Sequence, residues 1–420
     1  MENKHNNDES LFEDFALCEA LLRALNKNGF KNSTEIQKTV IPIAIDGFDI
    51  LAQSRTGSGK TLAFVIPILN KLLTDANKSA LILTPTRELA MQISDLINKL
   101  ISPDCPLKSV VLIGGSPMSR QLERLRRNPR LIIATPGRAL DHLDRRSLKL
   151  GQTEIVALDE FDRMLDMGFS EDVKSILKMC AEKKQILMFS ATANESIKAL
   201  AHKYLIDPAI ITIKNTESAS HSKITQEFHL CNSRDEKYTH VLSEISKYNN
   251  EPIIIFVNTK IEADSLRNFL TNEGVKSCCI HGDMQQGKRQ SNLKGFHDGK
   301  YNIIIGTDVL SRGIDVNGVK CVINYDIPNT VEAYIHRIGR TGRNGESGNA
   351  VSFLARKHKS FLDEVIRTTK IEIAKYPFDK NSRSSDDEGR DRGSGGARRS
   401  SDGYKGTRSG GNGYARKSRY

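Results

Sequence analysis

The sequence predicts an α/β protein that contains two tandem, doubly wound parallel-sheet domains. Short apolar runs rich in β-branched residues alternate with longer segments of helical periodicity, and the alternation resumes after a polar interval at residues 214–223. The apolar runs are continuous, which is typical of strands buried on both faces of a parallel sheet. The length of 420 residues also exceeds one ordinary core, so two or more domains are expected.

The strands can be placed in order along each domain. Residues 1–11 are expected to be a disordered N-terminus, and the first domain is expected over residues 12–213. Its strands are predicted in the apolar run before the glycine-rich turn at residues 57–59 and at 79–84, 109–113, 130–135, 154–159 and 185–190. Residues 214–223 form the predicted linker. The second domain is expected over residues 224–370, with strands at 252–257, 302–307, 321–326 and 350–355.

Residues 371–420 are predicted to form a disordered basic tail rich in Arg, Gly and Ser. Between residues 381 and 420 there are ten Lys and Arg against five Asp and Glu, and too few apolar side chains to order the segment. The tail is either a solubilising segment or a weak nucleic-acid contact, and its charge favours the second.

The composition limits the class of protein. A hydrophobic content of 38% and a charged content of 27% are typical of soluble globular proteins. The net charge of +11 suits a polyanion, either nucleic acid or an anionic membrane surface. The chain has no apolar run of spanning length, no leader-like start, and seven cysteines without a CxxC pair. We therefore expect a cytoplasmic protein with reduced thiols, and the cysteine spacing indicates neither a zinc site nor a disulfide framework.

A glycine-rich segment predicts a phosphate site. ILAQSRTGSGKT runs from an apolar strand into a turn and then a helical pattern, so backbone N–H groups and the helix N-terminus can face an anion. Lys60 is expected to reach the β and γ phosphates, and Thr61 to hold Mg²⁺. A flexible Gly-Ser turn is the alternative. The residues expected to bind nucleotide here are Ser54, Arg55, Thr56, Gly57, Ser58, Gly59, Lys60 and Thr61.

An acidic cluster follows the predicted strand at 154–159. In VALDEFDRMLDMGF, Asp159, Glu160 and Asp162 stand close together, either as a helix cap or facing a cation. Since ligands gather at the carboxyl ends of parallel strands, these acids are expected beside the phosphate loop. Asp159 then suits Mg²⁺ coordination, largely through water, and Glu160 suits the orientation of the attacking water as a base.

From about Phe12 to Lys370 the sequence resembles the DEAD-box ATP-dependent RNA helicases of the compact bacterial type. DEFD followed by RMLDMGF matches the family's motif II except that Phe161 replaces an alanine. The resemblance implies two RecA-like domains, ATP and Mg²⁺ as cofactors, and RNA-dependent ATPase and helicase activity on single strands and short duplexes. It also implies an adenine-reading element, in which an aromatic ring stacks on the base and an amide pairs with its edge, formed by Phe12, Phe30 and Gln37.

The resemblance assigns further motifs to RNA, to coupling and to the second domain's share of the ATP site. Contacts to the RNA backbone are implied for Pro85, Arg87, Gly114, Gly115, Thr135, Arg138 and Thr307. Coupling of the ATP state to unwinding is implied for Asp162, Ser190, Thr192 and His336, and we expect Ser190 and Thr192 to hydrogen-bond Asp162. Asp315, Arg340 and Arg343 are implied to contact ATP, the two arginines as fingers on the γ-phosphate. The alternative for the segment HRIGRTGR is an ordinary basic surface without a role at the ATP site.

Phe161 is the departure that bears most on activity. A ring beside the metal is expected to overpack the site at a cost of about 1–3 kcal/mol, but the carboxylates are retained, so ATPase activity is expected to survive. The alternatives are an ATP-independent or weakly hydrolysing RNA clamp or annealing scaffold, and a DNA translocase. Ribosome-assembly or RNA-degradation proteins are candidate partners, and no membrane contact is expected.

Overall fold

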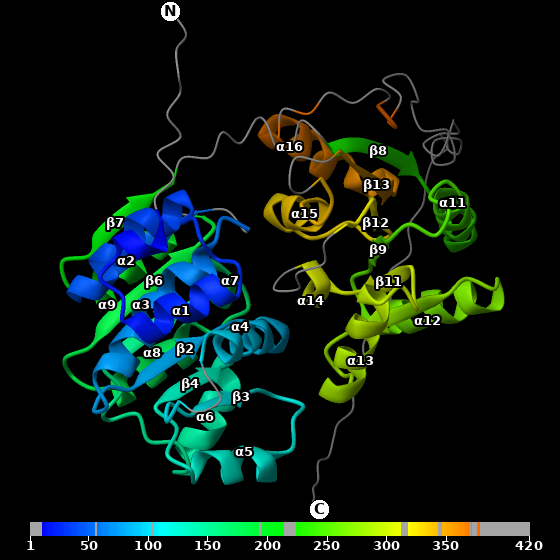
Figure 1. The fold of residues 1–420 in the computed structure, drawn as a ribbon. Coiled ribbons are helices and arrows are strands. Elements are labelled where there is room, and N and C mark those ends of the chain that lie inside the picture. The colour runs from blue at the N-terminus through cyan, green and yellow to red at the C-terminus, as the bar shows by residue number, and fades with distance from the viewer. Residues whose placement is uncertain are drawn as a thin grey trace, which may run out of the picture. The chain divides into compact units, whose positions relative to one another are not determined.

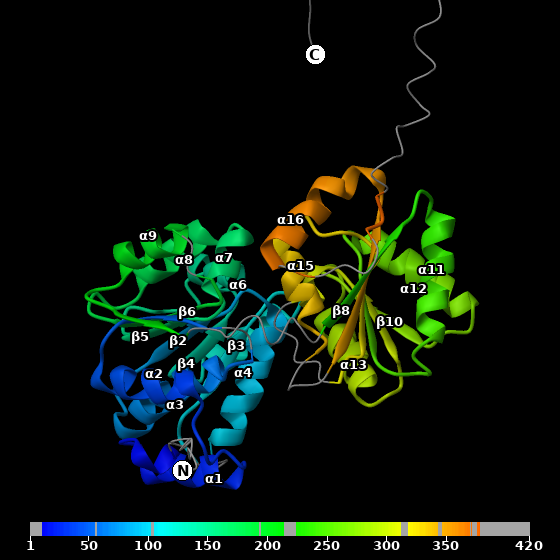
Figure 2. The same ribbon diagram turned by 90° about the horizontal axis from the view of Figure 1, so that it is seen from above.

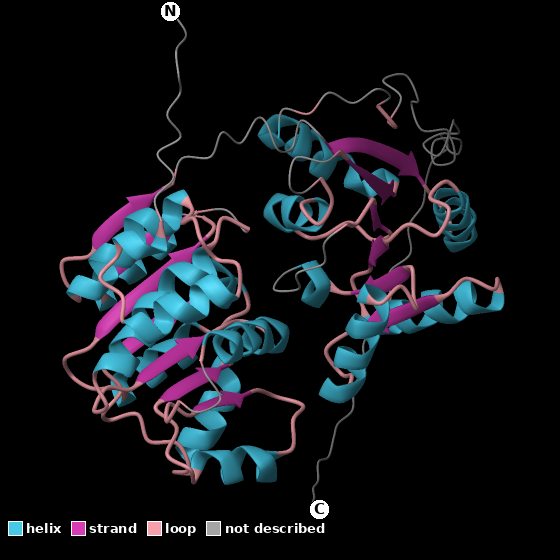
Figure 3. Cartoon of the chain, viewed as in Figure 1, coloured by secondary structure: helices cyan, strands magenta, loops and turns pink. Residues whose placement is uncertain are grey.

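The computed structural model describes residues 11–54, 57–101, 105–192, 195–213, 224–311, 318–342, 347–369, 371 and 376–378. The predicted linker at 214–223, nearly all of the predicted N-terminal segment at 1–11 and residues 379–420 of the predicted tail lie outside this part of the chain. The described residues form two α/β lobes, each built on its own parallel sheet (Figures 1 and 3). The predicted fold class is confirmed for both.

The first lobe contains a seven-stranded sheet in the order β3-β4-β2-β5-β6-β1-β7. All of its pairings are parallel. Every predicted strand of this lobe is present, and β7 is an additional edge strand. The strands are β1 (Ile50–Gln53), β2 (Ala80–Leu83), β3 (Ser109–Leu112), β4 (Leu131–Ala134), β5 (Ile155–Leu158), β6 (Gln185–Ser190) and β7 (Ala209–Thr212).

Helices cover both faces of this sheet, so the first lobe has two cores. In β2, Ile82 packs into the core with α1 to α4, whereas Leu81 and Leu83 pack into the core with α6 to α9. Figure 2 shows these two helix layers on either side of the strands. The helices are η1 (Phe12–Asp14), α1 (Glu19–Lys27), α2 (Glu35–Asp46), α3 (Lys60–Thr74), α4 (Arg87–Leu100), α5 (Met118–Leu125), α6 (Pro136–Asp144), α7 (Phe161–Asp166), α8 (Ser170–Met179) and α9 (Glu195–Tyr204).

The second lobe contains a six-stranded parallel sheet in the order β10-β11-β9-β12-β13-β8. The four predicted strands are present, and β8 and β10 were not predicted. Its strands are β8 (Ile224–Leu230), β9 (Ile253–Phe256), β10 (Ser277–Ile280), β11 (Ile303–Gly306), β12 (Cys321–Asn324) and β13 (Gly348–Leu354). Its helices are α11 (Arg234–Ser246), α12 (Lys260–Asn272), α13 (Gln286–His297), α14 (Asp308–Ser311), α15 (Val331–Ile338), η2 (Arg356–His358) and α16 (Lys359–Thr369).

Parallel pairing brings the carboxyl ends of all strands in a sheet to one edge. In the first lobe this edge gathers the segments that follow β1, β2, β3, β4, β5 and β6, which are the segments that carry most of the predicted site residues. None of the described helices has both the length and the hydropathy that crossing a bilayer requires.

Candidate functional site

The segment between β1 and α3 is shaped for a phosphate. Gly57 and Gly59 have left-handed backbones with φ of 81° and 95°, a region that L side chains rarely adopt. The α3 helix begins at Lys60, whose Nζ donates to the Ser54 carbonyl oxygen at 2.7 Å. The helix N-terminus and the lysine therefore both lie beside the turn, as an anion site needs. Thr61 is the second residue of α3, while Arg55 and Thr56 lie outside the described residues.

The side-chain amide of Gln37 contacts this turn directly. Its Nε2 donates to the Gly59 carbonyl oxygen at 2.9 Å, and its Oε1 accepts the Thr34 N–H at 2.9 Å as the capping box of α2. A Cβ at Gly59 would lie 2.4 Å from Gln37 Nε2, so glycine is required there. An amide has two donor and two acceptor positions, and each end of Gln37 therefore keeps one for a further partner. Phe30 is half-buried and packs against the first core.

The acidic cluster stands at the end of β5, two strands from β1 in the same sheet. Glu160 has a left-handed backbone with φ of 48° and ψ of 51°, which costs a non-glycine residue about 1 kcal/mol or more. Its Oε2 lies 3.2 Å from Arg163 Nη1, and both side chains are largely buried. Asp159 Oδ1 accepts the Glu160 N–H at 2.9 Å. Arg163, which stands in the RMLDMGF part of the motif but was assigned no role from the sequence, thus holds the predicted base in place.

Burial and like charge act together on Asp159. Burial, together with the neighbouring Glu160 carboxylate, raises the pKa of Asp159 to about 7, although Lys60 opposes both. These interactions place Lys60 and the two acids within electrostatic reach of one another. A buried carboxylate kept only partly ionised near neutral pH is typical of a group that faces a cation.

Asp162 ties α7 to the segment that follows β6. Its Oδ2 accepts the N–H groups of Ala191 and Thr192 at 3.0 and 3.1 Å and the Thr192 hydroxyl at 3.2 Å. The expected bond from Thr192 is therefore present. The expectation for Ser190 is wrong: its hydroxyl donates to the Thr192 carbonyl oxygen at 2.6 Å, because the chain turns back on itself directly after the strand.

Phe161 lies in the second core. It is the first residue of α7 and belongs to the apolar cluster that contains Leu158 and Met164. Its neighbours Glu160 and Asp162 contact Arg163 and the Ala191–Thr192 segment. The expectation of a ring beside the metal stays a prediction.

A second set of predicted residues meets where β2, β3 and β4 end. The guanidinium of Arg87, the first residue of α4, lies against Gly114 and Gly115: Cβ atoms there would fall 2.9 and 2.5 Å from its nitrogens. Arg138 Nη1 donates to the Ser116 carbonyl oxygen at 3.2 Å. Burial lowers the pKa of Arg138, and the nearby Arg87 lowers it further although Asp141 raises it. Two arginines held close together suit a phosphate.

The remaining predicted contacts in this set occupy fixed positions. Thr135 is the N-cap of α6, and Pro85 is buried directly before α4. Gln121, which the sequence motifs did not indicate, donates from Nε2 to the carbonyl oxygens of Ile113 and Ser116 at 3.2 and 3.1 Å. These bonds fix the backbone on both sides of the Gly114–Gly115 turn. Gln121 is itself buried beside His142.

In the second lobe the described residues of the segment HRIGRTGR are mostly buried. The alternative interpretation, that this segment is an ordinary basic surface, is therefore wrong. Arg337 is fully buried: it contacts Asp308 Oδ1 at 2.6 Å and donates to the Asp326 carbonyl oxygen at 2.6 Å and to Asn258 Oδ1 at 3.0 Å. It therefore joins the segments after β9, β11 and β12. Arg340 is also buried, with Nε 3.4 Å from the His336 carbonyl oxygen. Thr307 directly precedes α14, while Asp315 and Arg343 lie outside the described residues.

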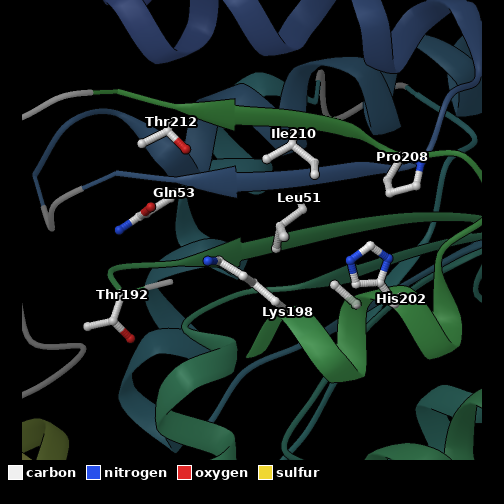
Figure 4. Close-up of a pocket in the computed structure, with 9 residues that line it drawn as sticks. Leu51, Gln53, Thr192, Lys198, His202, Pro208, Ile210 and Thr212 are labelled. Carbon is white, nitrogen blue, oxygen red and sulfur yellow. The ribbon is translucent and has the colours of Figure 1, made fainter. Parts of the chain in front are cut away.

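A cavity of about 420 Å³ lies between α9 and the strands β1 and β7. Figure 4 shows Lys198 and His202 of α9 facing Leu51 and Ile210 across it, with Thr192 at one end. The phosphate-loop lysine and the acids of β5 do not line it. The cavity is thus distinct from the phosphate site.

Comparisons with known proteins agree with this arrangement. The DEAD/DEAH box helicase family matches residues 34–200, and the helicase conserved C-terminal domain matches residues 236–345. The chain is 40% identical over 360 residues to the ATP-dependent RNA helicase CshA of Listeria monocytogenes, covering 86% of this chain and 69% of the relative. It is 42% identical over 343 residues to the DEAD-box ATP-dependent RNA helicase RhpA of Helicobacter pylori, covering 82% and 69%.

A solved structure shows the same fold. Dbp5 of S. cerevisiae bound to RNA and ADP BeF3 superimposes with a TM-score of 0.77 at 29% sequence identity, covering 86% of this chain and 94% of that one. The similarity extends through both lobes, and that relative carries nucleotide and RNA together.

Proposed function

The chain belongs to the DEAD/DEAH-box family of ATP-dependent RNA helicases, and we propose that the phosphate loop and acid pair of its first lobe drive the unwinding of short RNA duplexes. The observation that carries this proposal is the convergence of Lys60, Asp159 and Glu160 at one edge of the first sheet. This convergence supports the proposal, because an anion site, a cation site and a base at one edge could act on the same substrate.

Each group at this edge has a distinct proposed role. Lys60 binds the β and γ phosphates, and the turn at Gly57–Gly59 supplies backbone N–H groups. Thr61 and Asp159 offer the hard oxygen ligands that Mg²⁺ prefers, largely through water, and a bound Mg²⁺ would neutralise phosphate charge. Glu160, held by Arg163, orients the attacking water and accepts its proton. Gln37 uses its remaining donor and acceptor to read the adenine edge, with an aromatic ring such as Phe30 on the base.

The RNA backbone is proposed to bind the Arg87–Arg138 set. Two arginines, the Thr135 hydroxyl and the N–H groups of a glycine pair are typical phosphate contacts, which fix position without reading sequence. Thr307 is the proposed contribution of the second lobe. The S. cerevisiae relative in complex with RNA supports a polynucleotide of this kind.

We propose that arginines of the second lobe couple the ATP state to RNA binding. Arg340 and Arg343 would reach the γ-phosphate when ATP joins the lobes, with Asp315 also on the nucleotide, and such fingers contribute roughly 10³ to 10⁵ in rate in other NTPases. Asp162, Thr192 and Ser190, together with His336, are the proposed relay between ATP state and RNA grip. The carboxylate of Asp162 supports this role because it holds the segment after β6 from α7.

Several wider assignments belong to the same proposal. We place the domain boundaries at 12–213 and 224–370, with a linker between them and a basic disordered tail over 371–420. A cytoplasmic location and ribosome-assembly or RNA-degradation proteins as partners agree with bacterial relatives that are named RNA helicases. The tail would add weak, salt-dependent RNA contact.

RNA is expected to stimulate phosphate release far more than DNA of the same sequence. A contact set that includes 2′-hydroxyls distinguishes the two. Phosphate release by the full chain with Mg²⁺, measured against single-stranded RNA and matched DNA, decides this point. Equal stimulation would contradict RNA as the substrate. Strand displacement without any ATP requirement would favour the clamp or annealing alternative.

Replacement of Gly115 by alanine is expected to weaken RNA binding about tenfold, with ATP affinity unchanged. The added Cβ would lie 2.5 Å from Arg87 Nη1, and φ of 76° is strained for alanine, so together they cost on the order of 1 kcal/mol and displace the arginine. RNA affinity is measured by fluorescence anisotropy. Gly151→Ala is the matched control, since it has no positive φ and no atom within 4 Å of the added Cβ. Equal RNA affinity of both variants would show that Arg87 does not contribute to RNA binding.

A further inference from the structure

Three side chains of different chemistry converge in the second lobe, away from the phosphate site. Asp264 lies on α12, Cys279 lies on β10, and His281 directly follows β10. One oxygen, one sulfur and one nitrogen of these residues lie within 4.8 Å of one another. Cys279 Sγ is 3.5 Å from Asp264 Oδ1, and His281 Nε2 is 3.4 Å from Asp264 Oδ2.

These separations match the edges of a zinc tetrahedron. With Zn–S of about 2.3 Å and Zn–N and Zn–O of about 2.0 Å, tetrahedral angles give edges of roughly 3.5 Å for sulfur to oxygen and 3.3 Å for nitrogen to oxygen. The two measured distances are of this size, but they end on different oxygens of Asp264, so the carboxylate must rotate to bring one oxygen to the vertex that both edges share. Three protein ligands also leave one coordination position open, as in zinc sites that keep a water molecule.

Burial and access both suit a bound ion. Cys279 and His281 are buried, whereas the Asp264 side chain is 51% exposed. An ion can therefore reach the buried thiol and imidazole past a solvated carboxylate, which gives the entry path that a metal site needs.

A second cluster of this kind occurs among the described residues, but a cation already occupies it. Glu227, His229 and Glu244 lie together near β8 and α11. There the Lys247 ammonium contacts Glu244 Oε1 at 2.7 Å. Among the described residues, Asp264 forms an ion pair with His281 and with no lysine or arginine.

We propose that Asp264, Cys279 and His281 bind one Zn²⁺ ion, with water as the fourth ligand. The ion would fasten α12 to the end of β10, directly before the segment that leads into α13. Sequence spacing could not indicate this site, because Asp264 and Cys279 are 15 positions apart, and the three ligands form no CxxC or HxxxH pattern.

Zinc binding should release a proton from the thiol. Burial, together with the Asp264 carboxylate, raises the pKa of Cys279 to about 11, although Arg267 and Lys288 oppose this. The free thiol is therefore protonated at neutral pH, and a metal must displace that proton to bind the thiolate.

The test uses the full, untagged chain and Co²⁺ and Zn²⁺ alone as probes. A thiolate–Co²⁺ charge-transfer band is expected in the near ultraviolet, and Zn²⁺ should abolish it at one equivalent. Cys279→Ser should remove the band and weaken Zn²⁺ binding by more than the roughly 10- to 100-fold that loss of an outer-shell partner costs. Cys278→Ser is the matched control: it is the neighbouring buried thiol on the same strand, but it faces the opposite core, near the Asn292 carbonyl oxygen.

Two results would overturn the proposal. One is an equal loss of binding in Cys278→Ser and Cys279→Ser, and the other is a wild-type protein without the charge-transfer band. Should Cys279→Ser fail to fold, Asp264→Asn decides, because this half-exposed side chain can change without disturbing the core. That variant must lose Zn²⁺ affinity while it keeps its ATPase rate in metal-chelated, Mg²⁺-containing buffer. Retained affinity in Asp264→Asn would likewise overturn the site.

Discussion

Replacement of Glu160 by glutamine is expected to lower RNA-stimulated ATPase activity by roughly 10² to 10⁴, the range that a positioned general base contributes. The fold should tolerate the change, because glutamine has the same shape and can keep the left-handed backbone at this position. Its carbonyl oxygen can still accept from Arg163, which contacts Glu160 Oε2 at 3.2 Å. ATP affinity should therefore stay near that of the wild type, since Lys60 and the glycine turn are unchanged.

The measurement compares single-turnover phosphate release with equilibrium binding of a fluorescent ATP analogue. Glu171→Gln serves as the control, because this carboxylate is exposed on α8 and pairs only with Lys174 among the described contacts. A Glu160→Gln rate within a few-fold of the control would rule out Glu160 as the base. A loss of nucleotide binding would instead identify Glu160 as part of the binding site.

Strands buried on both faces were predictable from the sequence, whereas the edge strands β7, β8 and β10 were not; the edge strand β3 was predicted, because its apolar run is continuous. In β2, β4 and β5 every residue is apolar and buried, so the continuous pattern indicated them directly. In β8, buried residues alternate with exposed ones, and β7 is mainly exposed, because each borders its sheet on one side only. The short β10 carries two cysteines and a serine, which have weak strand propensity.

The motifs predicted which residues belong to the site but not how they contact one another. The phosphate loop and the acids follow from residue type and from the parallel sheet, so their common edge was predictable. The contact between Gln37 and Gly59, the bond of Ser190 to its own segment and the burial of Phe161 depend on backbone geometry. Arg163 and Arg337 stand in the motif segments RMLDMGF and HRIGRTGR, but their contacts were not predicted, and the partners of Arg337 come from other segments.

Replacement of Asp159 by asparagine is expected to stabilise the nucleotide-free protein while it abolishes ATPase activity. Burial, with help from the Glu160 carboxylate, raises the pKa of Asp159 from 3.8 to about 7. The folded protein therefore holds a proton that the unfolded chain releases above about pH 4. As pH rises from about 4 to about 7, the free energy of unfolding falls, by up to about 4 kcal/mol for a pKa difference of this size. Asparagine keeps the acceptor for the Glu160 N–H and removes this cost.

The stabilisation by Asp159→Asn should grow as pH rises, and this dependence can be tested in magnesium-free buffer. The stabilisation by Asp159→Asn should be complete at pH 8 and shrink to less than half at pH 5, where the wild-type carboxyl is already protonated in the folded state. Urea unfolding of the first lobe at both pH values measures it, with Glu182→Gln, an exposed carboxylate of the same lobe, as the control. A destabilised variant at pH 8 would show that Lys60 pairs with Asp159 strongly enough to outweigh burial. A stabilised but inactive variant would mean that the buried acid is retained at the expense of stability because a cation must bind there.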